Sequence, residues 1–296
     1  MTSVRRSFEL DGPYDLENSL LVRECGRLRP TFAVLGPGKL LRASQTPEGP
    51  VTLALVLVDG RLEAEAWGPG RAWLLDALPS VLGLDDRPPR FEGRLARVQR
   101  RYPGVRFTRA VDLFELLANT VISQRVAWRD AVASKRAILG AHALPAPGPG
   151  GLRLPLAPEQ WRSLTTADLA GFGIERKRAS TLLALALRAE RIRSWATLPS
   201  ETFATRLESF PGVGPWTRAM VQGHGLGELD AVPLGDYDLP SMVSSFLAGE
   251  PRATDERMLE LLEPYAGQRF RVLRLLWAAG IQAPRFGPRK RLTRLA

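Results

Sequence analysis

Residues 211–215 read Pro-Gly-Val-Gly-Pro and lie between two segments whose apolar residues recur at helical spacing. Two prolines and two glycines within five residues cannot belong to one continuous helix, because both residue types disfavour a helix interior. The stretch therefore predicts a tight turn between two helices. Pro215 suits the first turn of the second helix, where its missing N–H costs nothing. This helix–turn–helix order constrains the fold more than any other feature of the chain.

The turn also has a chemistry of its own. The start of the second helix exposes unpaired backbone N–H groups, which attract anions such as phosphate together with the helix dipole. Gly212 and Gly214 lack a Cβ, so another molecule can approach the backbone closely, and Thr217 adds a hydroxyl beside the same phosphate. Such a contact reads no base. From the turn alone, a structural hairpin without a ligand is an equally good interpretation.

The charge of the chain favours nucleic acid as the ligand. The 296 residues include 41 Lys and Arg against 31 Asp and Glu, a net charge of +10. This excess predicts attraction to a polyanion, although a solvated basic surface is the alternative interpretation. Apolar residues make up 45% of the chain, enough to bury a core in two domains or one large one.

The few cysteines and histidines exclude several kinds of site. Cys25 is the only cysteine, so the chain cannot form an internal disulfide, a cysteine-based zinc site or an iron–sulfur cluster. With His142 and His224 as the only histidines, a histidine metal site is not expected, and His224 is interpreted as an ordinary polar residue near a helix end. The N-terminus lacks a signal-peptide pattern, and no segment predicts a membrane span. We expect a protein of a reducing compartment, the cytoplasm.

The first third of the chain carries strand signals. Residues 51–68 predict a hairpin around Asp59-Gly60, and residues 31–44 predict a strand broken by a Gly-Pro-Gly turn. Residues 71–84 have the apolar spacing of a short helix. Together they predict an α+β domain built on an antiparallel sheet.

Beyond residue 110 the pattern becomes helical. Residues 110–140 predict helix with a polar interruption at Ser123-Gln124-Arg125, and residues 143–158 form a loop rich in proline and glycine. Further helices are predicted within residues 166–190, 201–210 and 255–280. The predicted organisation is an α+β fold with an N-terminal sheet domain (1–105), a mostly α-helical domain (106–284) and a basic C-terminal tail (285–296).

An aspartate follows the hairpin at a distance of about one helix. Asp236 lies in "DAVPLGDYDLPS", residues 230–241, directly after Gly235, and is expected to begin another helix. An ionised carboxylate at a helix start can stabilise a cationic transition state or activate a water. Asp230 and Asp238 are rivals for this role, and a simple helix cap is the alternative interpretation of Asp236.

These residues carry a resemblance to a known family. "FPGVGPWTRAMV" followed by "VPLGDYD" resembles the helix-hairpin-helix DNA glycosylase superfamily, and within it the DNA-3-methyladenine glycosylase II type. The resemblance covers about residues 100–282. It includes "YPGVRFTRAVDLFELLANTVISQ", "GFGIERKRASTLLALA" and "GQRFRVLRLLWAAG". The β-rich first 100 residues fit the extra domain of that subfamily.

The resemblance implies a monofunctional enzyme of base-excision repair. Bifunctional members place a lysine nucleophile where this chain has Trp216, and an indole cannot form a Schiff base with the sugar. The family flips the damaged base out of the duplex, and Asp236 would stabilise the oxocarbenium-like transition state of glycosidic hydrolysis. Trp216 and Trp277 would hold an alkylated, cationic base such as 3-methyladenine or 7-methylguanine by stacking and cation–π attraction. Burial in the core is the alternative for Trp277.

Two positions depart from the family pattern. Met220 stands where a tyrosine is frequent, which leaves the base preference open. Arg125 stands at the position of the apolar wedge that fills the space of the flipped base, and Gln124 before it would contact the lesion strand.

The resemblance also implies the partners. The partner is double-stranded DNA with damaged bases, bound by a monomer without an organic cofactor or catalytic metal. A structural Na⁺ or K⁺ could bind the backbone carbonyls of Glu208, Phe210 and Val213. The alternatives are a glycosylase for deaminated or oxidised bases, and a non-catalytic DNA-damage-binding protein, which would not need the carboxylate of Asp236 near a phosphate backbone.

Overall fold

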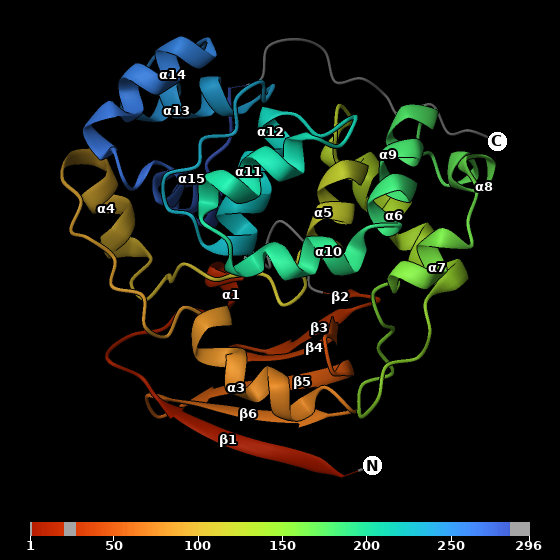
Figure 1. Cartoon of the computed structure of the whole chain (residues 1–296). Helices are drawn as coiled ribbons and strands as arrows, with labels where there is room; N and C mark the ends of the chain where they lie inside the picture. Colours follow the sequence, from red (N-terminus) through yellow and green to blue (C-terminus); the bar gives the residue numbers. More distant parts are fainter. Residues whose placement is uncertain (1, 21–27, 285–296) are drawn as a thin grey trace.

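The structure, a computed structural model, describes residues 2–20 and 28–284 of the chain (Figure 1). An antiparallel sheet lies at one end of the molecule, and a group of helices is stacked on it. The basic tail 285–296 and Cys25 lie outside the described residues. Within the described ranges, none of the helices has the length and apolar character that a membrane span requires.

The sheet is antiparallel throughout, with the strand order β1-β6-β5-β4-β3-β2. The predicted hairpin is confirmed, with Asp59 (φ 47°) and Gly60 (φ 75°) in the left-handed conformation that a two-residue hairpin turn requires. The break at Gly-Pro-Gly is confirmed between β3 and β4. The strands are β1 (Ser3–Glu9), β2 (Leu28–Arg29), β3 (Phe32–Gly36), β4 (Lys39–Thr46), β5 (Gly49–Val58) and β6 (Arg61–Trp67).

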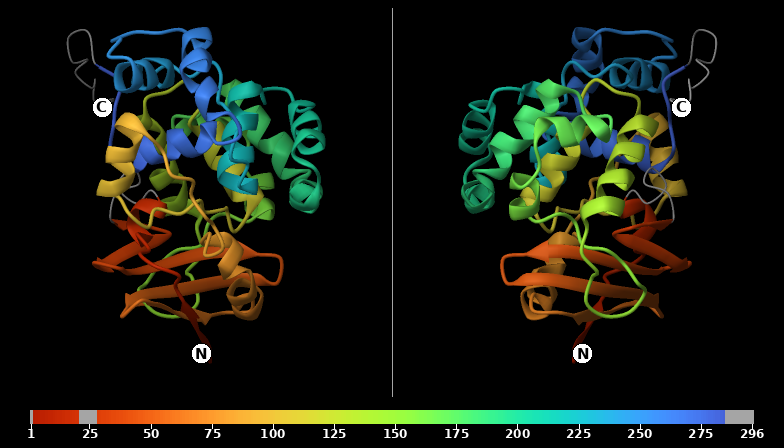
Figure 2. Two further views of the ribbon diagram at one scale, coloured as in Figure 1. Left: turned by 90° about the vertical axis from the view of Figure 1, so that its left-hand side faces the viewer. Right: turned by 90° about the vertical axis from the view of Figure 1, so that its right-hand side faces the viewer.

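The two faces of the sheet have different covers. On one face, Leu40, Leu53 and Leu55 pack against the helix α3 (Arg71–Val81), where the sequence predicts a helix. On the other face, Leu41 and the alternate residues beside it pack against residues 143–157, which we call the covering loop. The covering loop returns from the helices to the sheet, and its Arg153 N–H donates to the carbonyl of Pro30 (2.7 Å). Figure 2 shows this loop beside the strands in both views.

The helical part follows the predicted pattern in outline: each predicted segment contains helix, and residues 123–125 separate α5 from α6, whereas α4 was not predicted. The shorter helix α1 (Leu16–Ser19) follows β1. The remaining helices are α4 (Gly93–Arg101), α5 (Leu113–Ile122), α6 (Trp128–His142), α7 (Pro158–Arg162), α8 (Thr166–Gly171), α9 (Arg176–Ala186), α10 (Ala189–Ser194), α11 (Ser200–Glu208), α12 (Pro215–Val221), α13 (Leu239–Leu247), α14 (Asp255–Leu262) and α15 (Arg269–Ala278).

Buried ion pairs join distant parts of the chain. Arg271 of α15 holds the carboxylate of Asp86 through two hydrogen bonds (2.6 and 2.7 Å), and both side chains are largely buried. Arg193 of α10 holds Asp112 at the start of α5 in the same two-pronged way (2.6 and 3.0 Å). Removing either partner of such a buried pair would leave an uncompensated charge, so these contacts fix the helices around α5 and α15.

Candidate active site

A cleft of about 1750 Å³ lies between the sheet and the helices, and residues of the hairpin of α11 and α12 form part of its wall. Most of the predicted site residues lie on its wall, although they come from four separate stretches of the chain. Those on the wall are Gln124, Arg125, Gly212, Trp216, Thr217, Met220, Asp236 and Trp277. Gly214 and the three residues of the predicted cation site are not on it.

The two hairpin glycines have different surroundings. Gly212 has φ +89°, and a Cβ there would lie 2.1 Å from Oγ1 of Thr181, so the fold itself requires glycine. Gly214 is extended (φ −113°, ψ −174°), and a Cβ there would meet nothing within 4 Å. The fold therefore does not require glycine at position 214.

The turn after α5 is tied to the hairpin. The Gln124 side-chain amide donates to the carbonyl of Gly212 (2.9 Å) and to Oγ1 of Thr217 (2.7 Å). Thr217 is only 2% exposed, so its hydroxyl lies inside the protein, away from the hairpin surface where the sequence analysis expects a phosphate. Both side chains hold the hairpin in place in this structure, and their contact with DNA remains a prediction.

Arg125 follows Gln124 with an exposed side chain and a φ of 54°. A non-glycine residue in the left-handed region costs free energy, and such residues are frequent at functional sites. This conformation presents Arg125 at the tip of the turn, beside the cleft. The location is compatible with a wedge, and that role remains a prediction.

Asp236 is fixed by three hydrogen bonds. Its Oδ2 accepts from Nε1 of Trp216 (2.7 Å), and its Oδ1 accepts from the backbone N–H groups of Asp238 and Leu239 (2.9 Å each). The expectation that Asp236 begins a helix is wrong: α13 starts at Leu239, because Asp236 caps the preceding turn with its side chain. The carboxylate faces the cleft at the N-terminus of α13, where the helix dipole favours negative charge.

The rival aspartates have other surroundings. Asp230 is paired with Arg269 and is not on the cleft wall. Burial alone would raise the pKa of Asp230, but the hydrogen bonds from Arg269 outweigh it and lower the pKa. Asp238 is exposed, at the cap position of α13. Asp238 is also on the cleft wall, and Asp236 is distinguished by its hydrogen bond to Trp216, a predicted pocket residue.

Trp216 and Met220 lie at i and i+4, so they follow one side of α12, and His224 comes four residues after Met220, beyond the end of this helix. Residues Gln222–Leu226 form a π-turn with i→i+5 bonding, and His224 within it is on the cleft wall. His224 is not among the site residues predicted from the sequence.

His224 belongs to an aromatic cluster in the cleft. Its ring stacks on Trp277 (centroids 5.7 Å apart, planes at 26°) and meets Phe270 edge to face (5.0 Å). Phe270 is fully buried, whereas Trp277 is partly exposed on the cleft wall, so core packing alone does not describe Trp277. His224 lies just after the end of α12, near a helix end as expected, and burial, and then the charge of Arg274, hold its pKa well below the usual range.

A second buried acid lies on the cleft wall. Oε2 of Glu115, in the first turn of α5, is fully enclosed and has no hydrogen-bond partner among the described residues. Burial raises the pKa of Glu115 to about 7, although the positive charge of Arg42 opposes the shift. The raised pKa favours the protonated form of Glu115 more than in an exposed glutamate.

The predicted cation site is the outer bend of the hairpin. The Phe210 carbonyl accepts the Val213 N–H (3.0 Å), which occupies one of its two lone pairs and leaves the other for a cation. The Glu208 side chain lies 3.4 Å from Nε of Arg218. Binding of Na⁺ or K⁺ by the three carbonyls stays a prediction.

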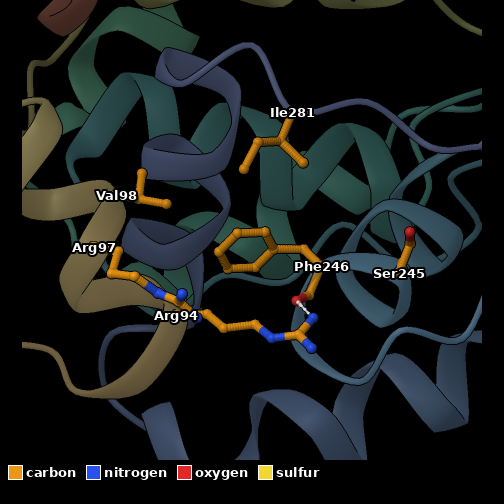
Figure 3. Close-up of a pocket in the computed structure, with 6 residues that line it drawn as sticks. All are labelled: Arg94, Arg97, Val98, Ser245, Phe246 and Ile281. Carbon is orange, nitrogen blue, oxygen red and sulfur yellow. Dashed lines mark hydrogen bonds between the residues drawn. The ribbon is translucent and has the colours of Figure 1, made fainter.

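A smaller hollow of about 380 Å³ lies between α4 and α13 (Figure 3). Arg94 crosses it and donates to the carbonyl of Phe246 (2.7 Å), and Arg97 and Val98 line the α4 side. Ile281 is the one residue that it shares with the cleft. None of the predicted site residues lies here.

The chain has a sequence relative among curated proteins. It is 28% identical over 166 residues to a probable bifunctional transcriptional activator/DNA repair enzyme AlkA of Mycobacterium tuberculosis. The match covers 55% of this chain and 32% of that protein, so the chain spans about a third of the relative it matches. No protein-family model matches the chain.

Solved structures share the fold over most of the chain. The 3-methyladenine DNA glycosylase of Archaeoglobus fulgidus has a TM-score of 0.79 at 20% identity, with 93% of this chain and 97% of that chain covered. The 8-oxoguanine glycosylase/lyase of Clostridium acetobutylicum, in complex with double-stranded DNA containing cytosine opposite 8-oxoguanine, has a TM-score of 0.67 at 14% identity, with 90% and 91% covered. The expected α+β architecture, a sheet followed by helices, is confirmed by these likenesses.

Proposed function

We propose that the chain, which is similar in sequence to a probable DNA repair enzyme AlkA and in fold to a 3-methyladenine DNA glycosylase, is a monofunctional helix-hairpin-helix DNA glycosylase of base-excision repair. The observation that carries the proposal is the fixed carboxylate of Asp236 in the cleft, hydrogen-bonded to Trp216 of the hairpin. In this proposal the enzyme acts as a monomer on double-stranded DNA in the cytoplasm, without an organic cofactor.

The proposed reaction is hydrolysis of the N-glycosidic bond of a flipped base. The target base must leave the stack before it can reach the cleft. As the bond to the base breaks, positive charge develops on the sugar, and a fixed negative charge stabilises it without reorganisation. Three donors hold the Asp236 carboxylate in place, and the same group can orient the attacking water.

Alkylated bases are the proposed substrates. A methylated purine such as 3-methyladenine or 7-methylguanine carries a positive charge and is a good leaving group, and aromatic faces such as Trp277 attract it. The likeness to a 3-methyladenine glycosylase supports this class. The fold is shared with an 8-oxoguanine glycosylase/lyase, so a glycosylase for oxidised or deaminated bases is the second candidate. A non-catalytic damage-binding protein is the third.

The released base tests the function directly. We expect incubation with methylated duplex DNA to release 3-methyladenine and 7-methylguanine, identified by chromatography, because both are activated as leaving groups. Duplexes with hypoxanthine and 8-oxoguanine serve as the matched substrates for the second candidate. Binding to damaged duplexes without release of any base would support the non-catalytic alternative.

The chemistry of the product tests the absence of a lyase step. Because Trp216 stands where bifunctional relatives are expected to carry a lysine, borohydride should trap no covalent enzyme–DNA adduct. The product should be an intact abasic strand that breaks only after heat or alkali. A trapped adduct, seen as a shifted band on a denaturing gel, would contradict the monofunctional assignment and leave the glycosylase assignment standing.

A further inference from the structure

We infer that His224 is a specificity-determining residue of the base pocket, whose Nε2–H donates a hydrogen bond to an acceptor atom on the edge of the flipped base. The inference rests on the proposed glycosylase function. Trp216 and Trp277 would hold the base by stacking, and His224 would in addition select bases that can accept a hydrogen bond.

The hydrogen bond to Arg274 fixes the tautomer of His224. Nη1 of Arg274 lies 2.8 Å from Nδ1 of His224. A guanidinium can only donate, so Nδ1 must accept and carries no proton. A neutral imidazole whose Nδ1 accepts has its proton on Nε2. Protonating Nδ1 as well would set two donors against each other, and the lowered pKa of His224 agrees with a neutral ring.

Aromatic contacts also fix the orientation of the His224 ring. Trp277 stacks on one side, and Phe270 meets the ring edge to face. A Cβ on Gly223 would lie 2.3 Å from the Phe270 ring, so glycine at this position lets Phe270 pack against the π-turn. Arg274 is itself anchored by hydrogen bonds to the carbonyl of Ser19 (2.5 Å) and to Thr108 (3.1 Å). Such support is what a preorganised recognition group requires.

The other end of the His224 ring carries the Nε2–H. His224 is on the cleft wall, eight residues after Trp216 in the chain. In the described parts of the chain, the one hydrogen bond of its side chain is the one at Nδ1, and Nε2 has no protein partner. A base without an acceptor at this point would bury the Nε2–H unpaired, and an unpaired buried donor is penalised more than a formed bond is rewarded.

The substrate class follows from these contacts. The favoured base is aromatic and keeps an unalkylated ring nitrogen or carbonyl oxygen at the edge that reaches His224. A neutral donor does not repel the positive charge of an alkylated purine, whereas a protonated histidine would. The site would therefore select a base by the position of its modification as well as by its charge.

Stable substrate analogues test the inference by binding. The first probe is a duplex with 3-methyl-3-deazaadenine, whose ring acceptors are N1 and N7, and two further duplexes replace N1 or N7 with C–H. One of the two replacements should weaken binding by the wild-type protein about tenfold, the equivalent of one hydrogen bond. In His224→Phe, which keeps an aromatic ring and loses the donor, the same replacement should have little further effect.

Two more variants complete the experiment. His224→Gln places an amide N–H near the position of Nε2 and should recover part of the discrimination. His142→Phe changes the other histidine, which is not on the cleft wall, and should behave as wild type. If wild type and His224→Phe respond equally to both replacements, or wild type responds to neither, His224 does not read the base. If wild type also releases no base from methylated DNA, the proposed function itself has failed.

Discussion

Asp236→Asn is expected to lower the single-turnover release of 7-methylguanine by a factor of about a hundred to a thousand, the loss typical of removing an electrostatic stabiliser. Binding to the damaged duplex should stay unchanged or become tighter, because a negative charge near phosphates is removed. Asparagine has nearly the same shape but one acceptor oxygen, whereas Asp236 accepts at both oxygens. The variant therefore loses the charge and one hydrogen bond together.

Two control variants separate these effects. Trp216→Phe keeps an aromatic ring and the carboxylate but removes the indole donor to Asp236, so it should reduce base release by much less than Asp236→Asn. Asp238→Asn changes the neighbouring exposed acid and should release bases at the wild-type rate. Wild-type release by Asp236→Asn, with loss of release by Asp238→Asn, would transfer the catalytic role to Asp238.

Gly214→Val is expected to fold normally and to bind duplex DNA about tenfold more weakly or worse, the loss expected for hydrogen bonds to charged phosphate. Valine readily adopts the extended backbone of Gly214, and its Cβ would meet nothing within 4 Å. The added side chain would instead stand between the hairpin backbone and an approaching phosphate. Undamaged and abasic-site duplexes should lose affinity together, because phosphate contacts carry no base information.

The neighbouring glycine provides the control. Gly212→Val would force a Cβ to within 2.1 Å of Thr181 at a positive φ, so it should lose thermal stability, measured by circular dichroism. If a folded Gly214→Val protein binds both duplexes as wild type does, the hairpin is structural. The DNA contact would then be sought in the arginine-rich residues 87–109 or 285–294.

The sequence is most informative where local chemistry decides the structure. Glycine and proline mark the hairpin at 211–215 and the turns between strands, and apolar spacing identifies α3 and α5. β1 was not predicted, because "SVRRSFE" is mostly exposed at the sheet edge and pairs through polar contacts such as Ser7 with Glu63. The division at residue 105 stays a prediction.

Long-range contacts account for what the sequence analysis missed at the site. The partners of His224 lie 46 or more residues away, on α15, and a π-turn cannot be seen in apolar spacing. The helix after Asp236 starts three residues later than expected, at Leu239. The Asp236 side chain accepts from the backbone N–H groups of Asp238 and Leu239 and so stabilises a turn in front of the helix. Gln124 and Thr217 were expected to face DNA, and their mutual hydrogen bond depends on how α5 meets the hairpin.

The covering loop has a consequence for the order in which the protein can fold during synthesis. The last strand of the sheet ends at Trp67 and α3 ends at Val81, but Leu152 and Leu154 pack on the second face of the sheet. A chain emerging from the ribosome therefore holds a sheet with one apolar face open until more than half of its residues have been made. Translation speed through residues 82–157 thus sets how long that face is available to chaperones or to other nascent chains.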